Sequence, residues 1–123
     1  MQYLTDRKRA NALGAARTGT VAHWGMTKSA VGLLILLPFF LFTFGSALGL
    51  PYEEARAYYA RPFPALVAAL MIVAGFLHFK NGVMSAIEDY THGVTREILV
   101  VLTTCLSYGA AAAGLLALVR LAL

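Results

Sequence analysis

The residues most able to do chemistry in this chain gather in one stretch, HFKNGVMSAIEDY, residues 78 to 90. It begins with His78 at the end of an apolar run and ends with Asp89 and Tyr90. Hydrocarbon offers an imidazole no hydrogen-bond partner, so a histidine inside a membrane span suggests a function. Asp89 and Tyr90 are expected at the membrane surface, within reach of both water and a lipid-soluble molecule. The stretch therefore predicts a binding site on a helix that is otherwise almost free of charge.

The composition identifies the solvent in which this helix lies. The chain has 123 residues, of which 59% are hydrophobic and only 13% charged, and its mean hydropathy is +0.70. Soluble domains carry about 25% charged residues, and a membrane-spanning helix needs about 20 apolar residues. We predict an all-α integral membrane protein with a cytoplasmic segment over 1–29 and a three-helix transmembrane anchor domain over 30–123. Its spans are expected at about 30–50, 64–87 and 98–119.

The distribution of basic residues predicts the orientation. The segment before the first span is rich in lysine and arginine, whereas the next loop balances two arginines with two glutamates. By the positive-inside rule, the N-terminus is expected in the cytoplasm and the C-terminus in the periplasm, across the inner membrane. A nucleic-acid partner is not expected, because no soluble surface combines basic with aromatic residues. The basic residues of the first segment are Arg7, Lys8, Arg9, Arg17 and Lys28.

Two further features predict local structure. The connection between the first two spans carries three tyrosines suited to the headgroup layer, and Glu53 to Ala60 is expected to form a short interfacial helix. Pro62 and Pro64 then mark the start of the second span. In the third span, Gly109 and Gly114 lie among alanines and predict a smooth surface for close helix packing.

Helical spacing places small and polar residues on the same face as His78. Gly75 lies three residues before it, and Gly82 and Asp89 lie four and eleven residues after it. A flat ring ligated through the imidazole needs room beside it, and a single axial histidine suits haem, with the second ligand on another chain. The alternative is a structural histidine bonded to a carbonyl or a serine of another helix, with glycines that serve helix packing.

The depth of the histidine follows from counting along the helix. His78 lies twelve residues before Tyr90, about 18 Å along the axis, and so is expected near mid-membrane. Lys80 is two residues beyond His78, so it points away from it, and its long side chain can extend toward the surface. The alternative for Tyr90 is an interfacial anchor, and for Asp89 a solvated helix end.

These residues form a motif, H-x(3)-G-x(6)-D-Y, made of His78, Gly82, Asp89 and Tyr90. On the second of three spans in a chain of this length, it resembles the small hydrophobic membrane anchor subunits of succinate dehydrogenase, the cytochrome b part of respiratory complex II. The N-terminal pattern of those anchors is present in weakened form as TGTVAHWGMTK, residues 18–28. The resemblance covers nearly the whole chain.

The resemblance implies a role for each matching residue. His78 would be the axial ligand to haem b and its iron, and Tyr90 would hydrogen-bond a carbonyl of ubiquinone. Asp89 would help to deliver protons or hold a neighbouring arginine. His23 and Lys28 match positions near the haem propionates, although Lys28 stands where arginine is usual and offers a point charge in place of a fork.

The resemblance also implies partners and a reaction. Flavoprotein and iron-sulphur subunits would oxidise succinate in the cytoplasm, and a second cytochrome b membrane subunit would share the haem with this chain. Electrons would then reduce ubiquinone, while this chain has no catalytic site of its own. Two alternatives remain: a fumarate reductase anchor that uses menaquinone, and a small structural or assembly membrane protein without a cofactor.

Overall fold

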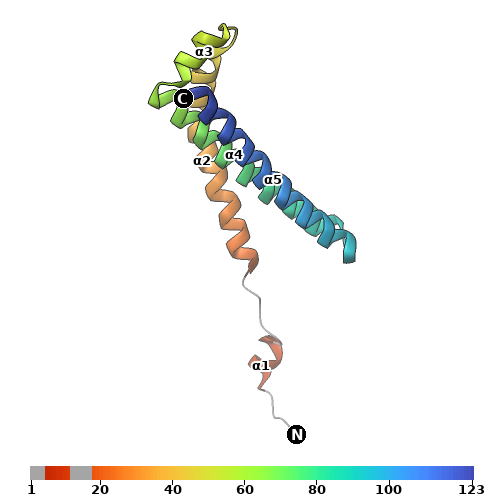
Figure 1. The fold of residues 1–123 in the computed structure, drawn as a ribbon. Coiled ribbons are helices and arrows are strands. Elements are labelled where there is room, and N and C mark those ends of the chain that lie inside the picture. The colour runs from red at the N-terminus through yellow and green to blue at the C-terminus, as the bar shows by residue number, and fades with distance from the viewer. Residues whose placement is uncertain (1–4, 12–17) are drawn as a thin grey trace.

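The fold is a small bundle of long helices (Figure 1). The computed structural model describes residues 5–11 and 18–123, so Arg17, one of the basic residues used to predict orientation, lies outside the described residues. The described residues contain helices and no strand, which confirms the all-α prediction, and three helices are long and apolar enough to cross a membrane. The helices are α1 (Asp6–Asn11), α2 (Thr18–Ala47), α3 (Tyr52–Tyr59), α4 (Pro62–Tyr90) and α5 (Gly93–Ala122).

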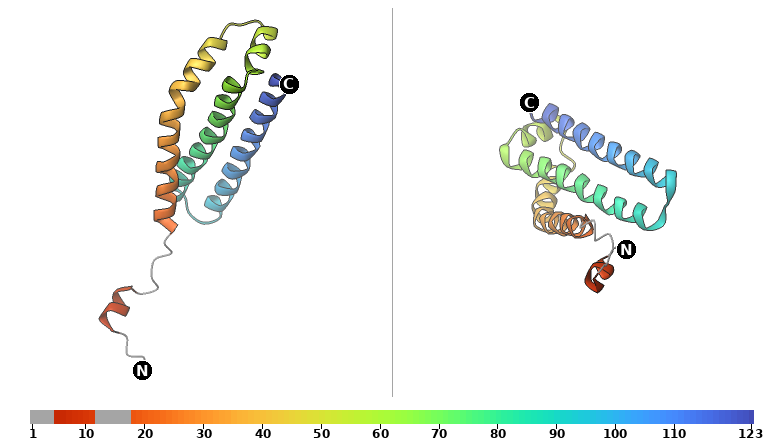
Figure 2. Two further views of the ribbon diagram at one scale, coloured as in Figure 1. Left: turned by 90° about the vertical axis from the view of Figure 1, so that its left-hand side faces the viewer. Right: turned by 90° about the horizontal axis from the view of Figure 1, so that it is seen from below.

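The middle helix organises the bundle. α4 packs against α2 along one side and against α5 along another, whereas α2 and α5 share few contacts (Figure 2). The connection between α4 and α5 is only two residues long, so these helices run antiparallel side by side. Gly93 adopts a φ of 61° at this turn, a conformation that a side chain would strain. The helix that carries the candidate site therefore has neighbours on two sides.

The helices extend beyond the apolar runs of the sequence. α2 begins at Thr18, well before Ala30, and has 30 residues. At 1.5 Å per residue it is about 45 Å long, about 15 Å more than a hydrocarbon core requires. The same excess applies to α4. On this helix, His78 lies about 24 Å along the axis from Pro62. If hydrocarbon begins at the α3 end of the bundle, His78 lies closer to the opposite membrane boundary than to the midplane.

The connection between α2 and α4 contains the short helix predicted from the sequence. α3 spans Tyr52–Tyr59 and follows Gly49, whose φ of 81° ends the preceding turn. Pro62 occupies the first position of α4, as predicted, where its missing N–H costs no hydrogen bond. Burial, with a smaller contribution from neighbouring Tyr58, raises the pKa of the Tyr59 phenol above its usual value.

The bundle buries little of its own apolar surface. The contact between α4 and α5 is close at Gly114, where an added Cβ would lie 3.3 Å from Ile72 Cγ2, so the predicted packing is confirmed there. Gly109 has no such neighbour. Among large hydrophobic residues, most of those on α2 and α5 are exposed on the outside of the bundle. Such a surface is stable only against lipid or other apolar chains. The buried hydrophobic residues are Tyr59, Val67, Ala68 and Ile87.

Candidate functional site

His78 is held by a hydrogen-bond chain that runs across the contact between α4 and α2. Its Nδ1 lies 2.9 Å from Ser29 Oγ, and the Ser29 hydroxyl donates to the Met26 carbonyl at 2.8 Å. A hydroxyl has a single hydrogen, so once Ser29 donates it to Met26, its oxygen can only accept from His78. In this arrangement the proton of the ring lies on Nδ1, and a lone pair is left on Nε2. Such a tautomer can ligate a metal through Nε2.

On one side of the α2–α4 contact, His78 lines an apolar hollow of about 340 Å³. We call this side the histidine flank, defined by the residues of this hollow. A neighbouring hollow of about 400 Å³ shares Met71 with it and is lined by Gly75 and aromatic side chains. The flank thus offers an apolar wall beside the imidazole. The residues of the histidine flank are Ala30, Leu33, Leu34, Leu37, Met71 and His78.

The two glycines beside His78 have different surroundings. A Cβ added to Gly75 would meet nothing within 4 Å, so Gly75 leaves open space one turn from the histidine. A Cβ added to Gly82 would lie 3.9 Å from Met26 Cε, which is ordinary contact with α2. Gly75 therefore fits the predicted room for a flat ring, and Gly82 serves helix packing.

A larger groove lies on the other side of the same contact. Its volume is about 720 Å³, and it includes Lys28 and Lys80 among mainly apolar neighbours. We call this side the lysine flank, defined by the residues of this groove. Lys28 and His78 therefore open into different hollows. The lining residues are Gly25, Lys28, Ser29, Gly32, Ile35, Leu36, Phe39, Leu70, Val73, Ala74, Leu77, Lys80 and Asn81.

A more polar hollow of about 480 Å³ continues from this groove toward the Tyr90 end of α4. It shares Gly25, Lys80 and Asn81 with the groove and adds His23 and Glu88. The His23 ring stands edge-on to the adjacent Trp24 ring, with centroids 6.3 Å apart. His23 thus lies on the lysine side of the contact, away from the hollow that His78 lines.

Lys80 contacts α5 as well as the groove. Its Nζ lies 3.4 Å from the Tyr108 hydroxyl and 5.3 Å from the centre of the Tyr108 ring. An ammonium over an aromatic face is attracted by the ring quadrupole. The predicted divergence from His78 is confirmed, and the Lys80 side chain lies against α5.

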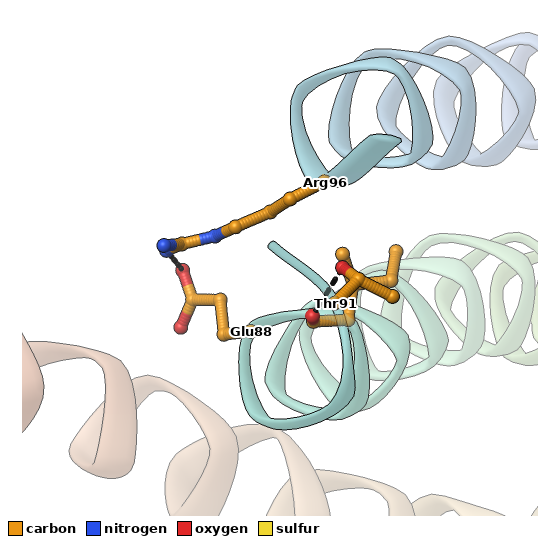
Figure 3. Close-up of polar contacts among 4 residues, drawn as sticks. Glu88, Thr91 and Arg96 are labelled. Atoms are coloured by element: carbon orange, nitrogen blue, oxygen red, sulfur yellow. Dashed lines mark hydrogen bonds and ion pairs between the residues drawn. The ribbon is translucent and has the colours of Figure 1, made fainter. Parts of the chain in front are cut away.

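The turn after α4 positions Asp89 and Tyr90 at the helix end. Thr91 Oγ1 donates to the Ile87 carbonyl at 2.6 Å and so caps the last turn (Figure 3). Tyr90 is 84% exposed, and Asp89 is exposed beside it. Both side chains are free for a ligand or partner subunit.

A charged pair lies at the turn beside Asp89. Arg96 NH2 lies 3.4 Å from Glu88 Oε1, so the arginine nearest to Asp89 along the chain pairs with Glu88 instead (Figure 3). Both side chains of the pair are about half exposed, so the interaction contributes little to stability. This pair joins the end of α4 to the start of α5.

Sequence reasoning singled out His78, Tyr90 and Asp89 as candidate site residues but did not name Ser29. The structure does not bring the whole set together, since Tyr90 is at the end of α4, while His23 and Lys28 line hollows other than that of His78. Ser29 could not be found by spacing, because its partner lies on another helix. Within the residues that the structure describes, no three histidine, cysteine or acidic side chains could together hold a metal ion.

Comparisons with known proteins agree over nearly the whole chain. Residues 1–118 match the family described as succinate dehydrogenase/fumarate reductase transmembrane subunit. The chain is 42% identical over 123 residues to the succinate dehydrogenase hydrophobic membrane anchor subunit of Paracoccus denitrificans, covering 100% of this chain and 95% of that protein. No solved structure matches.

Proposed function

Because the chain belongs to the family of succinate dehydrogenase/fumarate reductase transmembrane subunits, we propose that it helps to bind haem b and ubiquinone in a succinate dehydrogenase complex. In this role it anchors the complex in the membrane and allows electrons from succinate oxidation to reduce ubiquinone. The soluble subunits supply the oxidation of succinate. This chain supplies orientation and a suitable environment for the cofactors.

The observation that carries the proposal is the state of His78. Its Nδ1 lies 2.9 Å from Ser29 Oγ, and while the Ser29 hydroxyl donates to the Met26 carbonyl, the lone pair on Nε2 remains for iron. The Ser29 bond also agrees with the purely structural alternative, so the experiment below must separate the two.

The residues on the histidine flank fit half of a haem site. The walls of the hollow are apolar, and Gly75 leaves space one turn from His78. A hollow of about 340 Å³ open to the outside leaves the other wall and the second axial ligand to a partner chain. When bound there, haem would carry single electrons. His78 would hold its iron, and the apolar side chains around it would exclude water.

Tyr90 and Asp89 are proposed for the quinone. The exposed Tyr90 phenol can donate a hydrogen bond to a ubiquinone carbonyl and stabilise the charge that develops on that oxygen during reduction. Asp89 beside it can hold and release the protons that the reduced quinone takes up. We place His23 and Lys28 near the haem propionates on the resemblance alone, because in the structure they line hollows other than the one that His78 lines.

The partners follow from the same proposal. A second cytochrome b subunit completes the haem site, and the iron-sulphur and flavoprotein subunits dock at the Tyr90 end. The extra length of α2 and α4 beyond a hydrocarbon core suits such docking, because about ten residues of each helix extend past the apolar layer. The basic residues of the first segment support a cytoplasmic N-terminus and a periplasmic C-terminus.

The decisive experiment is a visible spectrum of the purified complex with His78→Ala. We expect the reduced b-type haem band of the unaltered complex to be lost, while succinate oxidation by a soluble dye continues. The matched control is His92→Ala, which removes an exposed histidine at the start of α5 and should keep the band. An unaltered band in His78→Ala, or no haem in the unaltered complex, would show that His78 is only a packing residue.

A further inference from the structure

The lysine flank carries two cations, Lys28 and Lys80, that do not line the hollow of His78. We propose that it binds an anionic phospholipid, whose phosphate pairs with Lys28 and Lys80 and whose acyl chain lies in the groove. This inference requires the membrane location of the bundle but none of its cofactors.

The depth of the two lysines matches a lipid phosphate. Lys28 is 19 residues from Ala47, and Lys80 is 18 residues from Pro62, which are the ends of these helices next to α3. At 1.5 Å per residue, both lysines lie about 27 to 28 Å from the α3 end, about one hydrocarbon thickness away. If hydrocarbon begins at the α3 end of the bundle, the backbone positions of the two lysines therefore lie near the level of the phospholipid phosphates.

The groove is polar at this level and apolar below it. The residues beyond the lysines, toward the α3 end, are Ile35, Leu36 and Phe39 on α2 and Leu70, Val73 and Leu77 on α4. An acyl chain hanging from a phosphate at the lysines would pass along these side chains. Gly32 keeps this wall smooth, because an added Cβ would meet nothing within 4 Å. The polarity of the groove thus runs in the same direction as that of a lipid.

The charge of the groove requires an anion. No acidic residue lines it, and among the described residues neither Lys28 nor Lys80 forms an ion pair. Tyr108 holds the Lys80 ammonium from the α5 side and uses only one of its three hydrogens. A cation at the edge of hydrocarbon is costly unless it is paired, and anionic lipids attract lysines at this level.

The absence of histidine from the lining decides between two anionic occupants. Haem also combines an apolar body with carboxylates, but its iron needs an axial ligand, and His78 lines the hollow on the other flank. A phospholipid needs only the two cations and the apolar wall. The groove therefore suits a lipid better than it suits haem.

The test measures lipid retention by the purified complex. The complex would be reconstituted in phosphatidylcholine vesicles with and without phosphatidylglycerol, then extracted again, and the bound lipids quantified by mass spectrometry. We expect phosphatidylglycerol to be enriched over phosphatidylcholine. Lys28→Gln and Lys80→Gln should each lower the enrichment by about fivefold, and the double variant by about 25-fold, since each lysine near anionic lipid contributes independently.

Matched variants separate charge, shape and cofactor effects. Arginine at both positions should keep the enrichment, and Arg120→Gln, which removes an exposed cation outside the groove, should not change it. Gly32→Leu should lower retention by filling the groove, at a position where an added Cβ meets nothing within 4 Å. Equal retention of both lipids by the unaltered complex would overturn the proposal, and so would an unchanged enrichment in the double glutamine variant or in Gly32→Leu. Loss of haem with unchanged lipid retention in the lysine variants would assign the cations to the haem propionates instead.

Discussion

The two flanks of the α2–α4 contact differ in chemistry although they share the same pair of helices. The histidine flank offers the imidazole of His78, hydrogen-bonded to Ser29, beside an apolar hollow of about 340 Å³. The lysine flank offers Lys28 and Lys80 at one end of a groove of about 720 Å³. One flank is suited to a metal-centred ring and the other to an anion with an apolar tail.

The difference shows how a helix separates two functions within a single turn. His78 and Lys80 are two residues apart, which is about 200° around an α-helix. Ser29 lies at the α2–α4 contact itself. Its hydroxyl is hydrogen-bonded to His78 of the histidine flank, and the residue also lines the groove of the lysine flank. A substitution on one flank should therefore leave the other largely unaffected.

The largest expected effect is on quinone turnover and comes from Tyr90, at the end of the helix that carries His78. Tyr90→Phe should slow succinate-to-ubiquinone turnover at least about tenfold, because a preorganised donor to a developing oxyanion contributes about 2 to 4 kcal/mol. Haem content and dye-linked succinate oxidation should not change. Tyr52→Phe, at an exposed tyrosine of α3, is the control and should have normal turnover. Normal quinone turnover in Tyr90→Phe would make Tyr90 an interfacial anchor.

The next effect tests the two sides of the contact by adding the same side chain to Gly75, which lines the hollow next to the histidine flank, and to Gly32 on the lysine flank. Gly75→Leu should reduce haem retention by at least about fivefold, because overfilling a packed site costs about 1 to 3 kcal/mol. Gly32→Leu adds the same volume on the lysine flank and should leave the haem spectrum unchanged. Both glycines have open space for a Cβ, so both variants should fold. Equal haem loss in the two variants would end the distinction between the flanks.

A smaller effect is expected from the residue that sequence reasoning missed. Ser29→Ala removes the acceptor for His78 Nδ1, and a lost hydrogen bond costs about 1 kcal/mol, so haem should dissociate about fivefold faster. The measurements are the rate of haem transfer to an acceptor protein that lacks haem and the shift of the absorption band of the reduced haem. Ser46→Ala is the control, since Ser46 bonds only the Phe42 carbonyl of its own helix. Identical behaviour of the two variants would remove Ser29 from the site.

The smallest effect concerns the ion pair at the turn. Arg96→Gln breaks the contact with Glu88. Because both side chains are about half exposed, the free energy of unfolding should fall by at most about 1 kcal/mol. Quinone turnover should stay within twofold, since Arg96 contacts Glu88 and not Asp89. A large loss of turnover would show that this arginine does serve Asp89 in the assembled complex.

The sequence by itself determined three helical spans and a short helix predicted over Glu53 to Ala60, which the structure places at Tyr52–Tyr59, and it located the start of α4 at the prolines Pro62 and Pro64. These features depend on local properties: apolar runs of span length and a proline that is tolerated only in the first turn. The face that His78 shares with Gly75 and Asp89 also follows from helical spacing alone.

The tertiary structure decided which residues meet. Ser29 and His78 are 49 positions apart, and their contact exists only because α2 and α4 run antiparallel in one register. The same register brings Lys28 and Lys80 to one level and places them on the flank opposite to His78. No spacing rule within a single helix could show this, because the side on which a neighbouring helix packs depends on the shapes of both helices.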